Sequence, residues 1–362
     1  MKKVGMITIY RKNYGAFLQA YALQCALRKA GCDPEIIQYD YYHDNTLFGV
    51  YLGQKVSVGN FIKKMCVELL CCFPHKKRQE VFDSSIKKNI AESKEHYSSY
   101  EQLCKNVPVY DIYLTGSDQV FNVNISPQAL KARLLCFADT GRKASYAASA
   151  GKGSIPEDYH EIFMEALSKF TFVSVREKKL SAFIKENYGV EAVQNIDPVF
   201  LLRPDEWSKF AEDTGYLKGK YIFYYRVLPQ SSLQEEAKRV SKELQLPVLV
   251  ADGNDRFSNQ LKHKGFLSPE QWVGYLRDAA YVVTNSFHGA SFVINYEKRA
   301  SILVPPQGGE RLINLIEKCA LNVKDISGST MDSDTENVYI ESRRYLEKER
   351  KRAYEYLRSL TM

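Results

Sequence analysis

The sequence predicts an α/β protein made of two doubly wound, Rossmann-like domains. Apolar, β-rich runs alternate with helical stretches along the chain, which is typical of a parallel sheet covered by helices on both faces. This alternation restarts after Asp197-Pro198 and Arg203-Pro204. The 362 residues are also enough for two hydrophobic cores.

The first domain, expected over 1–210, begins with a βαβ unit. Residues 3–9 form its first strand, 16–27 its helix and 34–39 its second strand. Further strands are expected at 109–115, 143–147 and 172–175. The segment 41–108 has few strand signals and many basic residues, so it is expected to be a helical insertion.

The second domain is expected over 211–340, after a boundary near 205–218. Its strands are expected at 220–225, 247–250 and 281–284, with a helix that ends near Leu244. The last segment, 341–362, is expected to form a C-terminal helix. One arrangement for it is packing back on the N-terminal domain, as terminal helices of two-domain α/β transferases do.

Composition excludes several classes of protein. Hydrophobic residues make up 45% and charged residues 26% of the chain, which is typical of a soluble globular protein. The best apolar run, Met65 to Phe73, contains Glu68 and is far shorter than the roughly 20 residues of a spanning helix. The apolar run at 4–9 lacks a small-residue cleavage site and is interpreted as a strand, which predicts a cytoplasmic protein.

Cysteine and histidine spacing predicts no metal site and no disulfides. The eight cysteines form no CxxC pair, so they are interpreted as reduced thiols of a cytoplasmic protein. The six histidines are dispersed, without an HExxH or HxH arrangement.

The net charge of +7 is concentrated in two windows. Residues 55–88 hold eight Lys or Arg against three acids, and 341–362 hold seven against four. These windows fit a peripheral contact with the inner face of an anionic membrane or with a lipid-phosphate carrier, or else solvated helix faces. Base-stacking aromatics interleaved with basic residues are not visible, so nucleic-acid binding is not expected.

Candidate site residues follow the predicted strands, because ligands of open α/β sheets bind beyond the carboxyl ends of the strands. Asn13, Tyr14 and Gly15 open a helix and could face an anion or a sugar hydroxyl, or form a plain helix start. After 109–115, a polar cluster could bind a polyol, with Asp118 taking a proton from a hydroxyl. The alternative is that Ser117 or Asp118 caps a helix.

Two further blocks follow strands of the first domain. The small residues around Ser149 would let a ligand approach the backbone. Arg176, followed by Glu177 and Lys178, could clamp a carboxylate or phosphate. It could equally pair inside the protein with Glu177 or another acid.

The strongest block runs from Thr284 to Phe292. Asn285 and Ser286 precede His288 and Gly289, which places an imidazole at the start of a predicted helix. An imidazole can transfer a proton, and the free N–H groups of a helix start can bind a phosphate. The alternative is a buried histidine bonded to backbone. Downstream, Arg311 ends a glycine-containing loop that could close over an anion.

Six blocks, in this order, resemble the polysaccharide pyruvyl transferase family. They are 13–23, 116–122, 145–149, 174–177, 197–202 and 284–289. The resemblance implies a two-domain fold similar to GT-B glycosyltransferases, with an interdomain cleft. It also implies transfer of the enolpyruvyl group of phosphoenolpyruvate onto a sugar of a cell-surface polysaccharide or its lipid-linked precursor, forming a pyruvate ketal. Phosphoenolpyruvate is then the donor substrate, and no cofactor is expected.

The resemblance associates His288 and Arg176 with phosphoenolpyruvate. Better-studied members carry an arginine where this chain has Ser286, so Arg311, Lys178 or Arg299 would have to supply that cation, or the donor would differ. The mechanism expected has His288 as acid, Asp118 as base toward the sugar, and Arg176 as part of the donor site. The expected substrate-binding residues are Asn13, Tyr14, Gly15, Ser117, Gln119, Asn122, Ser149, Lys178, Asn285, Ser286, Gly289 and Arg311.

Two other functions fit the same pattern. A glycosyltransferase with a nucleotide-sugar donor would use the same architecture, since fold does not fix function. A catalytically silent glycan-binding protein is favoured only by Ser286. The pyruvyl transferase hypothesis requires that His288 and Arg176, from opposite halves of the chain, converge in a shared interdomain crevice.

Overall fold

A computed structural model describes most of the chain and divides it into two compact units. Unit 1 comprises Met1–Lys12, Gln19–Asp197 and Tyr354–Met362, and unit 2 comprises Asn13–Leu18 and Pro198–Ala353. The described residues are 1–11, 13–40, 46–47, 50–51, 76–252, 255–261, 266–306, 308–321, 330–332 and 336–362.

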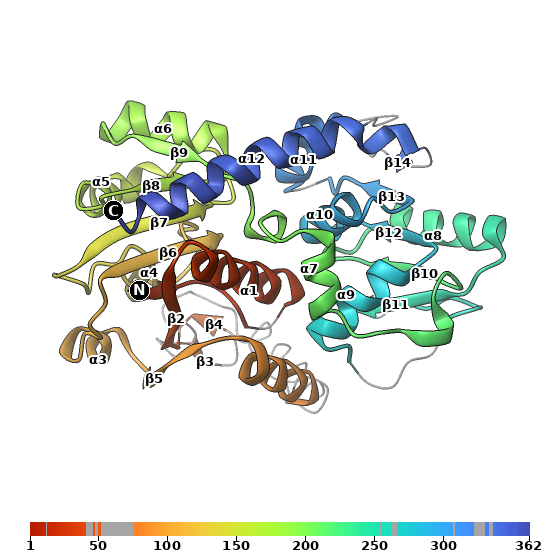
Figure 1. Cartoon of the computed structure of the whole chain (residues 1–362), viewed down its shortest axis with the longest axis horizontal. Coiled ribbons are helices and arrows are strands. Elements are labelled where there is room, and N and C mark those ends of the chain that lie inside the picture. Colours follow the sequence, from red (N-terminus) through yellow and green to blue (C-terminus); the bar gives the residue numbers. More distant parts are fainter. Residues whose placement is uncertain are drawn as a thin grey trace. The chain divides into compact units, whose positions relative to one another are not determined.

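Unit 1 is built on a seven-stranded parallel sheet with the order β5-β2-β1-β6-β7-β8-β9 (Figure 1). Its strands are β1 (Lys2–Ile7), β2 (Cys32–Tyr39), β5 (Glu92–Tyr97), β6 (Ile112–Asp118), β7 (Arg142–Ala148), β8 (Val173–Val175) and β9 (Ala192–Gln194). A separate pair joins β3 (Thr46–Leu47) to β4 (Val50–Tyr51). The strand order reverses between β1 and β6, and such a reversal is the point at which doubly wound sheets bind ligands.

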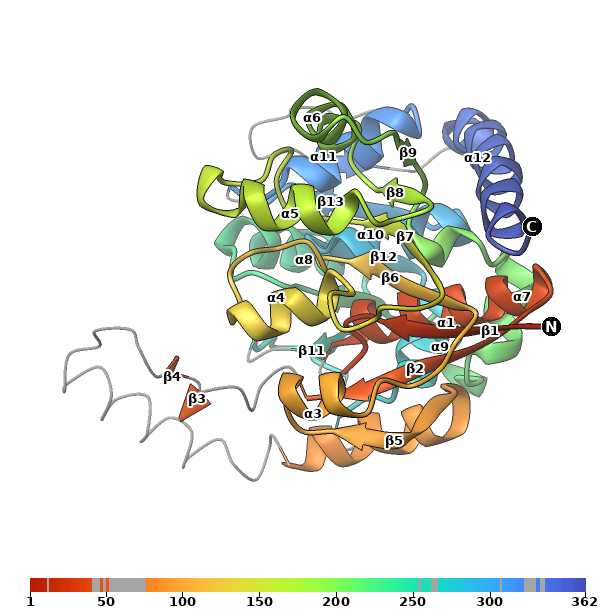
Figure 2. The ribbon, with the colours of Figure 1, turned by 90° about the vertical axis from the view of Figure 1, so that its left-hand side faces the viewer.

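Helices cover both faces of this sheet. They are α1 (Tyr14–Lys29), a helix over 76–89, α3 (Tyr100–Lys105), α4 (Pro127–Arg133), α5 (His160–Leu167), preceded by the 3₁₀ turn η1 (Glu157–Tyr159), and α6 (Lys178–Tyr188). Leu130 of α4, Phe163 of α5 and Leu180 of α6 join one core cluster with Tyr113 and Val175 of the sheet. Figure 2 shows α4 and α5 on one side of the sheet and the end of the last helix, α12 (Ile340–Ser359), on the other.

Near the end of α12, Tyr356 belongs to unit 1 and is anchored to its sheet. Its hydroxyl donates to the carbonyl oxygen of Ser145 at 2.7 Å. Its ring lies 6.1 Å from the ring of Tyr146 and 6.2 Å from that of Phe172. Burial raises the pKa of this phenol far above its ordinary value, because the phenolate would be cut off from water.

Unit 2 is built on a five-stranded sheet with the order β11-β10-β12-β13-β14, in which β14 alone pairs antiparallel among the described strands. The strands are β10 (Ile222–Tyr225), β11 (Val248–Asp252), β12 (Tyr281–Thr284), β13 (Ala300–Leu303) and β14 (Thr330–Asp332). The helices are α7 (Pro204–Phe210), α8 (Ser231–Leu244), α9 (Pro269–Asp278), α10 (Phe287–Tyr296) and α11 (Glu310–Lys318), with 3₁₀ turns η2 (Pro198–Phe200), η3 (Gly215–Leu217) and η4 (Glu336–Tyr339). The strand order reverses between β10 and β12.

Two clusters of apolar side chains cover this second sheet. Leu233 and Val240 of α8 pack with Ile222 and Val283 of the strands. A second, aromatic cluster joins Trp272 of α9 to Phe223 of β10, 5.6 Å between ring centroids, and to Phe292 of α10, 5.4 Å away. Trp207 of α7 lies 4.8 Å from Phe292. The predicted boundary near 205–218 therefore falls inside unit 2, because α7 packs with the second core.

The predicted fold class, α/β with two doubly wound sheets, is confirmed. Every strand expected from the sequence is present, but one is shifted. The strand expected at 109–115 is β6, at Ile112–Asp118. Gly116, Ser117 and Asp118 therefore lie within the strand, not after it. The cleft of the GT-B description depends on the placement of the two units and stays a prediction.

The described part of the segment 41–108, which was expected to be a helical insertion, holds the helix over 76–89 and α3 but also a strand. Residues 92–97 form β5, which pairs in parallel with β2. Only two of the six side chains of its sequence, ESKEHY, are buried, as an edge strand allows, so it lacks an apolar signal. The rest of the expected insertion is described at 76–91 and 98–108 and in the short strands β3 and β4; 41–45, 48–49 and 52–75 lie outside the described residues.

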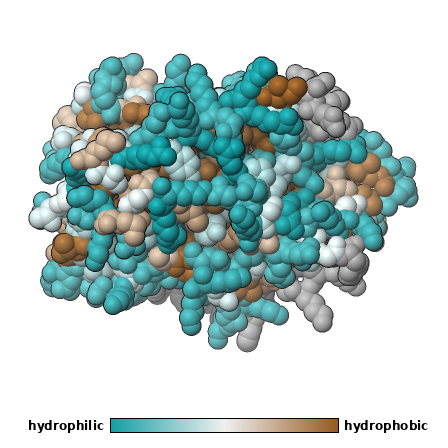
Figure 3. Space-filling model, in the orientation of Figure 1, coloured by the Kyte–Doolittle hydropathy of each residue, from teal (hydrophilic) through white to brown (hydrophobic). Residues whose placement is uncertain are grey.

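Hydrophilic side chains predominate on the face in Figure 3, and the hydrophobic ones are scattered. No helix in the described part of the chain is both long and apolar enough to cross a bilayer. A peripheral membrane contact stays a prediction, and much of its first basic window lies outside the described residues.

Asp278 of unit 2 allows a pH-dependent test of the stability of this unit. It accepts hydrogen bonds from Arg277 Nη2 at 2.6 Å and from Thr214 Oγ1 at 2.8 Å. Burial would raise the pKa of Asp278, but these donors outweigh it and hold the pKa below its ordinary value. A depressed pKa means that the ionised carboxylate stabilises the fold above its unfolded pKa and loses this contribution as the pH falls.

We therefore expect Asp278→Asn to lower the free energy of unfolding by about 1–2 kcal/mol at neutral pH. The difference from the wild type should persist down to a pH of about 4, the ordinary pKa of Asp, and shrink as the pH falls below it. Urea denaturation followed across pH measures this, with exposed Asp33→Asn as control. A deficit that stays constant with pH would contradict the assignment.

Candidate functional site

The expected site residues form two groups, one in each unit. The group in unit 2 lies at the carboxyl ends of β10 and β12, and the group in unit 1 lies at the carboxyl ends of β6, β7 and β8. Each group is thus at or beside the point where the strand order of its sheet reverses, as expected for ligand binding.

In unit 2, His288 is the second residue of α10 and is half-buried. The helix starts here because Ser286 caps it: the Ser286 side chain accepts a hydrogen bond from the backbone N–H of Gly289 at 3.2 Å. The partial positive charge of a helix N-terminus favours anions. Gly289 is required by packing, since a Cβ at this position would overlap the Thr284 side chain.

The start of α1 also belongs to unit 2 and brings Gly15 against His288. A Cβ at position 15 would overlap the imidazole at Nδ1, so the ring lies directly against the glycine. Asn13 caps α1, accepting from the Ala16 N–H at 2.7 Å. Tyr14 is buried, stacks on Trp272 with 5.6 Å between centroids, and donates to the Leu267 carbonyl at 3.0 Å. Asn13 and Tyr14 thus fix Gly15, and Gly15 leaves room for the imidazole.

Asn285 organises the loop that follows β10. Its Oδ1 accepts from the Val227 N–H at 3.0 Å, and its Nδ2 donates to the Leu228 carbonyl at 2.8 Å and to Gln230 Oε1 at 3.1 Å. The side chain therefore joins the ends of the two strands at the reversal in unit 2. These contacts favour a positioning role for Asn285.

The three cations considered for the position of Ser286 lie in different places. The Arg311 guanidinium carbon is 5.9 Å from the centroid of the Phe287 ring, beside the first turn of α10. Arg299 precedes β13 and lies over Tyr281, the first residue of β12, at 5.7 Å, and is thus at the amino ends of the strands. Lys178 begins α6 in unit 1 and is exposed. Within unit 2, only Arg311 of these is near His288.

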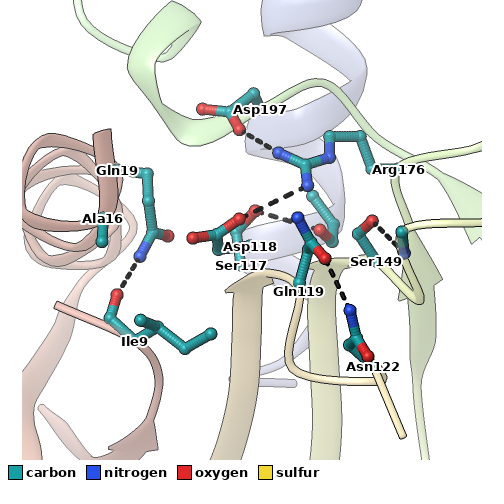
Figure 4. Close-up of polar contacts among 12 residues, drawn as sticks. Ile9, Ala16, Gln19, Ser117, Asp118, Gln119, Asn122, Ser149, Arg176 and Asp197 are labelled. Atoms are coloured by element: carbon teal, nitrogen blue, oxygen red, sulfur yellow. Dashed lines mark hydrogen bonds and ion pairs between the residues drawn. The ribbon is translucent and has the colours of Figure 1, made fainter. Parts of the chain in front are cut away.

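In unit 1, Arg176 lies among three carboxylates, of which Figure 4 shows those of Asp118 and Asp197. Its Nη1 donates to Asp197 Oδ2 at 2.6 Å, its Nη2 is 3.7 Å from Asp118 Oδ1, and its Nε is 3.6 Å from Glu177 Oε1. The Arg176 side chain is 7% exposed and that of Asp197 is fully buried. The internal pairing left open by the sequence is present.

This cluster has one positive and three negative groups, a formal net charge of −2. Burial alone would lower the pKa of Arg176, but the carboxylates of Asp197, Glu177 and Asp118 outweigh it and raise the pKa above its ordinary value. A site with this net negative charge favours a ligand with neutral hydroxyl groups over an anionic ligand. Asp118 itself has a left-handed backbone, with φ of 64°, which Asp tolerates better than most residues.

Two serines of the unit 1 group are fully buried and bonded within the sheet. Ser117 Oγ donates to the Ala147 carbonyl at 3.0 Å. Ser149 Oγ donates to Glu177 Oε1 at 2.6 Å and accepts from the Gly151 N–H at 3.0 Å. These contacts favour structural roles: Ser149 holds Glu177 beside Arg176. Their contact with substrate stays a prediction.

Gln119 and Asn122 follow β6 and form an amide pair. Asn122 Nδ2 donates to Gln119 Oε1 at 2.7 Å (Figure 4). The turn between them is held to the next strand by a hydrogen bond from the Phe121 N–H to the Ser149 carbonyl, at 3.0 Å. The sequence placed these two side chains in one polar cluster, and the structure does bring them together.

Sequence reasoning missed two charged residues of unit 2. Arg226 follows β10 and forms an ion pair with Asp255, which also accepts from the Tyr224 hydroxyl at 3.1 Å. The rule that singled out Arg176, a cation directly after a strand, would have found Arg226. Asp255 lies in a loop with no pattern of its own. Asp197 was noted only as part of a block, although it is the closest partner of Arg176.

The site residues of the two units belong to the sequence blocks described above, which follow one another in order over most of the chain. A family model described as polysaccharide pyruvyl transferase matches residues 13–302. The chain belongs to the polysaccharide pyruvyl transferase family. Both groups of site residues lie within the matched part, and membership identifies the protein as a transferase.

Solved structures show only distant likeness to this family member, and no curated protein matches its sequence. The UDP co-structure of S. aureus MnaA is 11% identical, covering 99% of this chain and 91% of that chain, with a TM-score of 0.49. UDP-N-acetylglucosamine 2-epimerase from Rickettsia bellii is 10% identical, covering 98% and 96%, with a TM-score of 0.48. E. coli heptosyltransferase WaaC is 11% identical, covering 83% and 87%, with a TM-score of 0.40. The fold class therefore rests on the two sheets themselves.

The described residues include no evident metal-binding cluster. Over the described ranges, no group of three or more His, Cys, Asp or Glu side chains is placed to hold a metal ion. Cys32, Cys104, Cys136 and Cys319, all in those ranges, are free thiols. The expected absence of a metal and of a cofactor stays a prediction.

Proposed function

We propose that this protein transfers the enolpyruvyl group of phosphoenolpyruvate onto a sugar of a cell-surface polysaccharide or its lipid-linked precursor, and forms a pyruvate ketal. The single observation that carries the proposal is the family match over residues 13–302. The geometry of His288 at the N-terminus of α10 supports it, because that arrangement suits a phosphorylated donor and a proton transfer.

The donor is assigned to unit 2. Phosphoenolpyruvate carries a phosphate and a carboxylate, which favour the first turn of α10 and the nearby Arg311 guanidinium. His288, held against Gly15, is the acid that protonates the methylene carbon. In this proposal Arg311 replaces the arginine that other members carry at the position of Ser286.

The acceptor hydroxyl is assigned to Asp118 in unit 1. Arg176 is already engaged by three carboxylates, so we assign it to orienting Asp118, not to binding the donor anions. The carboxylate of Asp118 can then accept the proton of an attacking sugar hydroxyl. Convergence of His288 and Arg176 in one crevice stays a prediction.

The reaction balances without another reactant. A proton adds to the methylene carbon, which becomes a methyl group, and a sugar hydroxyl oxygen bonds to the central carbon as Asp118 takes its proton. The bond from this carbon to the phosphate oxygen then breaks, and the oxygen of a second sugar hydroxyl bonds to the same carbon and completes the ketal. The departing phosphate takes the proton of this second hydroxyl, and the proton held by Asp118 restores the one that His288 gave. Inorganic phosphate leaves, and the sugar gains C₃H₂O₂.

The decisive experiment measures phosphate release from phosphoenolpyruvate with a panel of free and lipid-linked galactose, mannose and N-acetylhexosamine acceptors. We expect one acceptor to release phosphate and to gain C₃H₂O₂ by mass spectrometry, in equal amounts. Release of a nucleotide from a nucleotide sugar, with no phosphate from phosphoenolpyruvate, would instead support a glycosyltransferase and overturn the proposal.

A further inference from the structure

We propose that a cavity in unit 1 is the subsite for one neutral hexose of the acceptor glycan. The cavity has a volume of about 150 Å³ and lies beyond the carboxyl ends of β6 and β7. Its lining includes Gln119, Asn122, Asn124, Gly151, Lys152 and Ser154. Calling the ligand the acceptor rests on the function proposed above, whereas binding of a hexose does not.

The polar lining of the cavity includes amides held in a fixed arrangement. Asn122 Nδ2 donates to Gln119 Oε1 at 2.7 Å, and the Asn124 N–H donates to Asn122 Oδ1 at 2.9 Å. An amide group offers both donors and acceptors, which matches sugar hydroxyls that also do both. Because these bonds orient the amides before a ligand arrives, less ordering entropy is lost on binding.

The lining of the cavity also contains apolar side chains. Phe121 and Ile155 line the cavity and are buried, and Pro156 and Ala150 also line it. A pyranose ring presents C–H groups on its faces and hydroxyls at its edges, so a lining that contains both apolar side chains and amides matches both kinds of group.

Gly151 keeps this cavity open. A Cβ at position 151 would lie 2.8 Å from Gln119 Oε1 and 3.4 Å from Asn122 Nδ2, and the residue has a φ of +78°. Any larger residue would push against the amide pair and strain the backbone. The loop after β7 can approach the amides only because position 151 is a glycine.

Residues that line the cavity are close in sequence to Asp118, the proposed base. Gln119 directly follows Asp118, and Ser149, which holds Glu177 beside Arg176, is two residues before Gly151. The loops that line the cavity are therefore the same loops that carry the carboxylate cluster. A hexose bound there would be held by the segments that position Asp118.

Two variants and a matched control test the subsite. Asn122→Ala removes the central amide, and Ser154→Tyr fills the cavity from an exposed lining residue, with little effect on folding expected. Asn187→Ala is the control, because Asn187 is an exposed asparagine of α6 whose amide also donates to a carbonyl, that of Phe183, at 2.9 Å. Thermal unfolding confirms that each variant is folded.

Saturation-transfer NMR with the methyl glycosides of galactose, mannose and N-acetylglucosamine measures binding without turnover. We expect at least one to bind the wild type and Asn187→Ala, with about tenfold weaker binding by Asn122→Ala and Ser154→Tyr, the effect of losing one or two hydrogen bonds. In the turnover assay, the KM for the acceptor should rise by a similar factor, while the KM for phosphoenolpyruvate stays within twofold.

The outcomes separate the subsite from the proposed function. If turnover occurs but both variants keep the wild-type KM for the acceptor, the subsite is wrong and the function stands. If hexose binds, and both variants lose binding, yet no phosphate is released with any acceptor, the subsite stands and the function fails. If none of the glycosides binds the wild type, the subsite is refuted.

Discussion

Replacing His288 with alanine is expected to lower the turnover number by two to four orders of magnitude, the range of typical general-acid contributions. The expectation follows from the proposed function, in which the imidazole protonates the methylene carbon of phosphoenolpyruvate. Phosphate release measures it. His96→Ala is the control, since His96 lies on β5 in unit 1 and contacts Asp40 at 3.1 Å.

Gly15→Ala should reproduce part of this loss without removing the imidazole. The added Cβ would overlap His288 at Nδ1, so the ring must move. The same change near the start of an ordinary helix would be neutral or slightly stabilising. A drop in the turnover number with unchanged thermal stability would therefore report the position of the ring. If His288→Ala keeps full activity, the imidazole is not the acid.

Replacing Arg176 with methionine is expected to lower the free energy of unfolding of unit 1 by about 3–5 kcal/mol, the usual cost of removing one partner from a buried ion cluster. Asp197 would be left fully buried without its cation, and Asp118 and Glu177 nearly so. Because the pKa of Arg176 is raised above an already high ordinary value, its contribution is present at every pH at which the protein is studied.

Urea denaturation with two probes measures this effect. The chain has two tryptophans, Trp207 and Trp272, and both belong to unit 2, so their fluorescence reports unit 2 while circular dichroism reports both units. Arg176→Met should shift the dichroism transition more than the fluorescence transition. Asp197→Asn combined with Arg176→Met should recover part of the loss. Equal stability of Arg176→Met and the wild type would show that the cluster is not energetically coupled.

The order of elements could be predicted from the sequence because parallel sheets leave a strong signal. Strands buried on both faces are continuous apolar runs, as in β1, β10 and β12, whose described side chains are almost all buried. The edge strand β5 buries only two of its six side chains and therefore has no continuous run of apolar residues. The shift of β6 has a related cause: its last residues, Gly116 to Asp118, are small or polar, yet all are buried.

The site could be predicted in part, by the rule that ligands bind beyond strand ends. That rule placed Asn285 and His288 correctly beside a reversal of strand order, and it placed Gln119 with Asn122. It could not foresee that Arg176 would be surrounded by three acids, because Asp118 and Asp197 are distant from it in sequence. Nor could it show that Gly15 contacts His288, which depends on the fold of unit 2.

The division of the chain into its two units has a practical consequence for dissecting the protein. Unit 1 needs Tyr354–Met362 from the far end of the chain, and unit 2 needs Asn13–Leu18 from the start. No single cut can release either half with all of its own residues. A truncation after residue 210 would lose the Tyr356 anchor and would retain Tyr14 without Trp272 to stack on. Studies of the halves therefore call for circular permutation or co-expression of fragments, not for simple shortening.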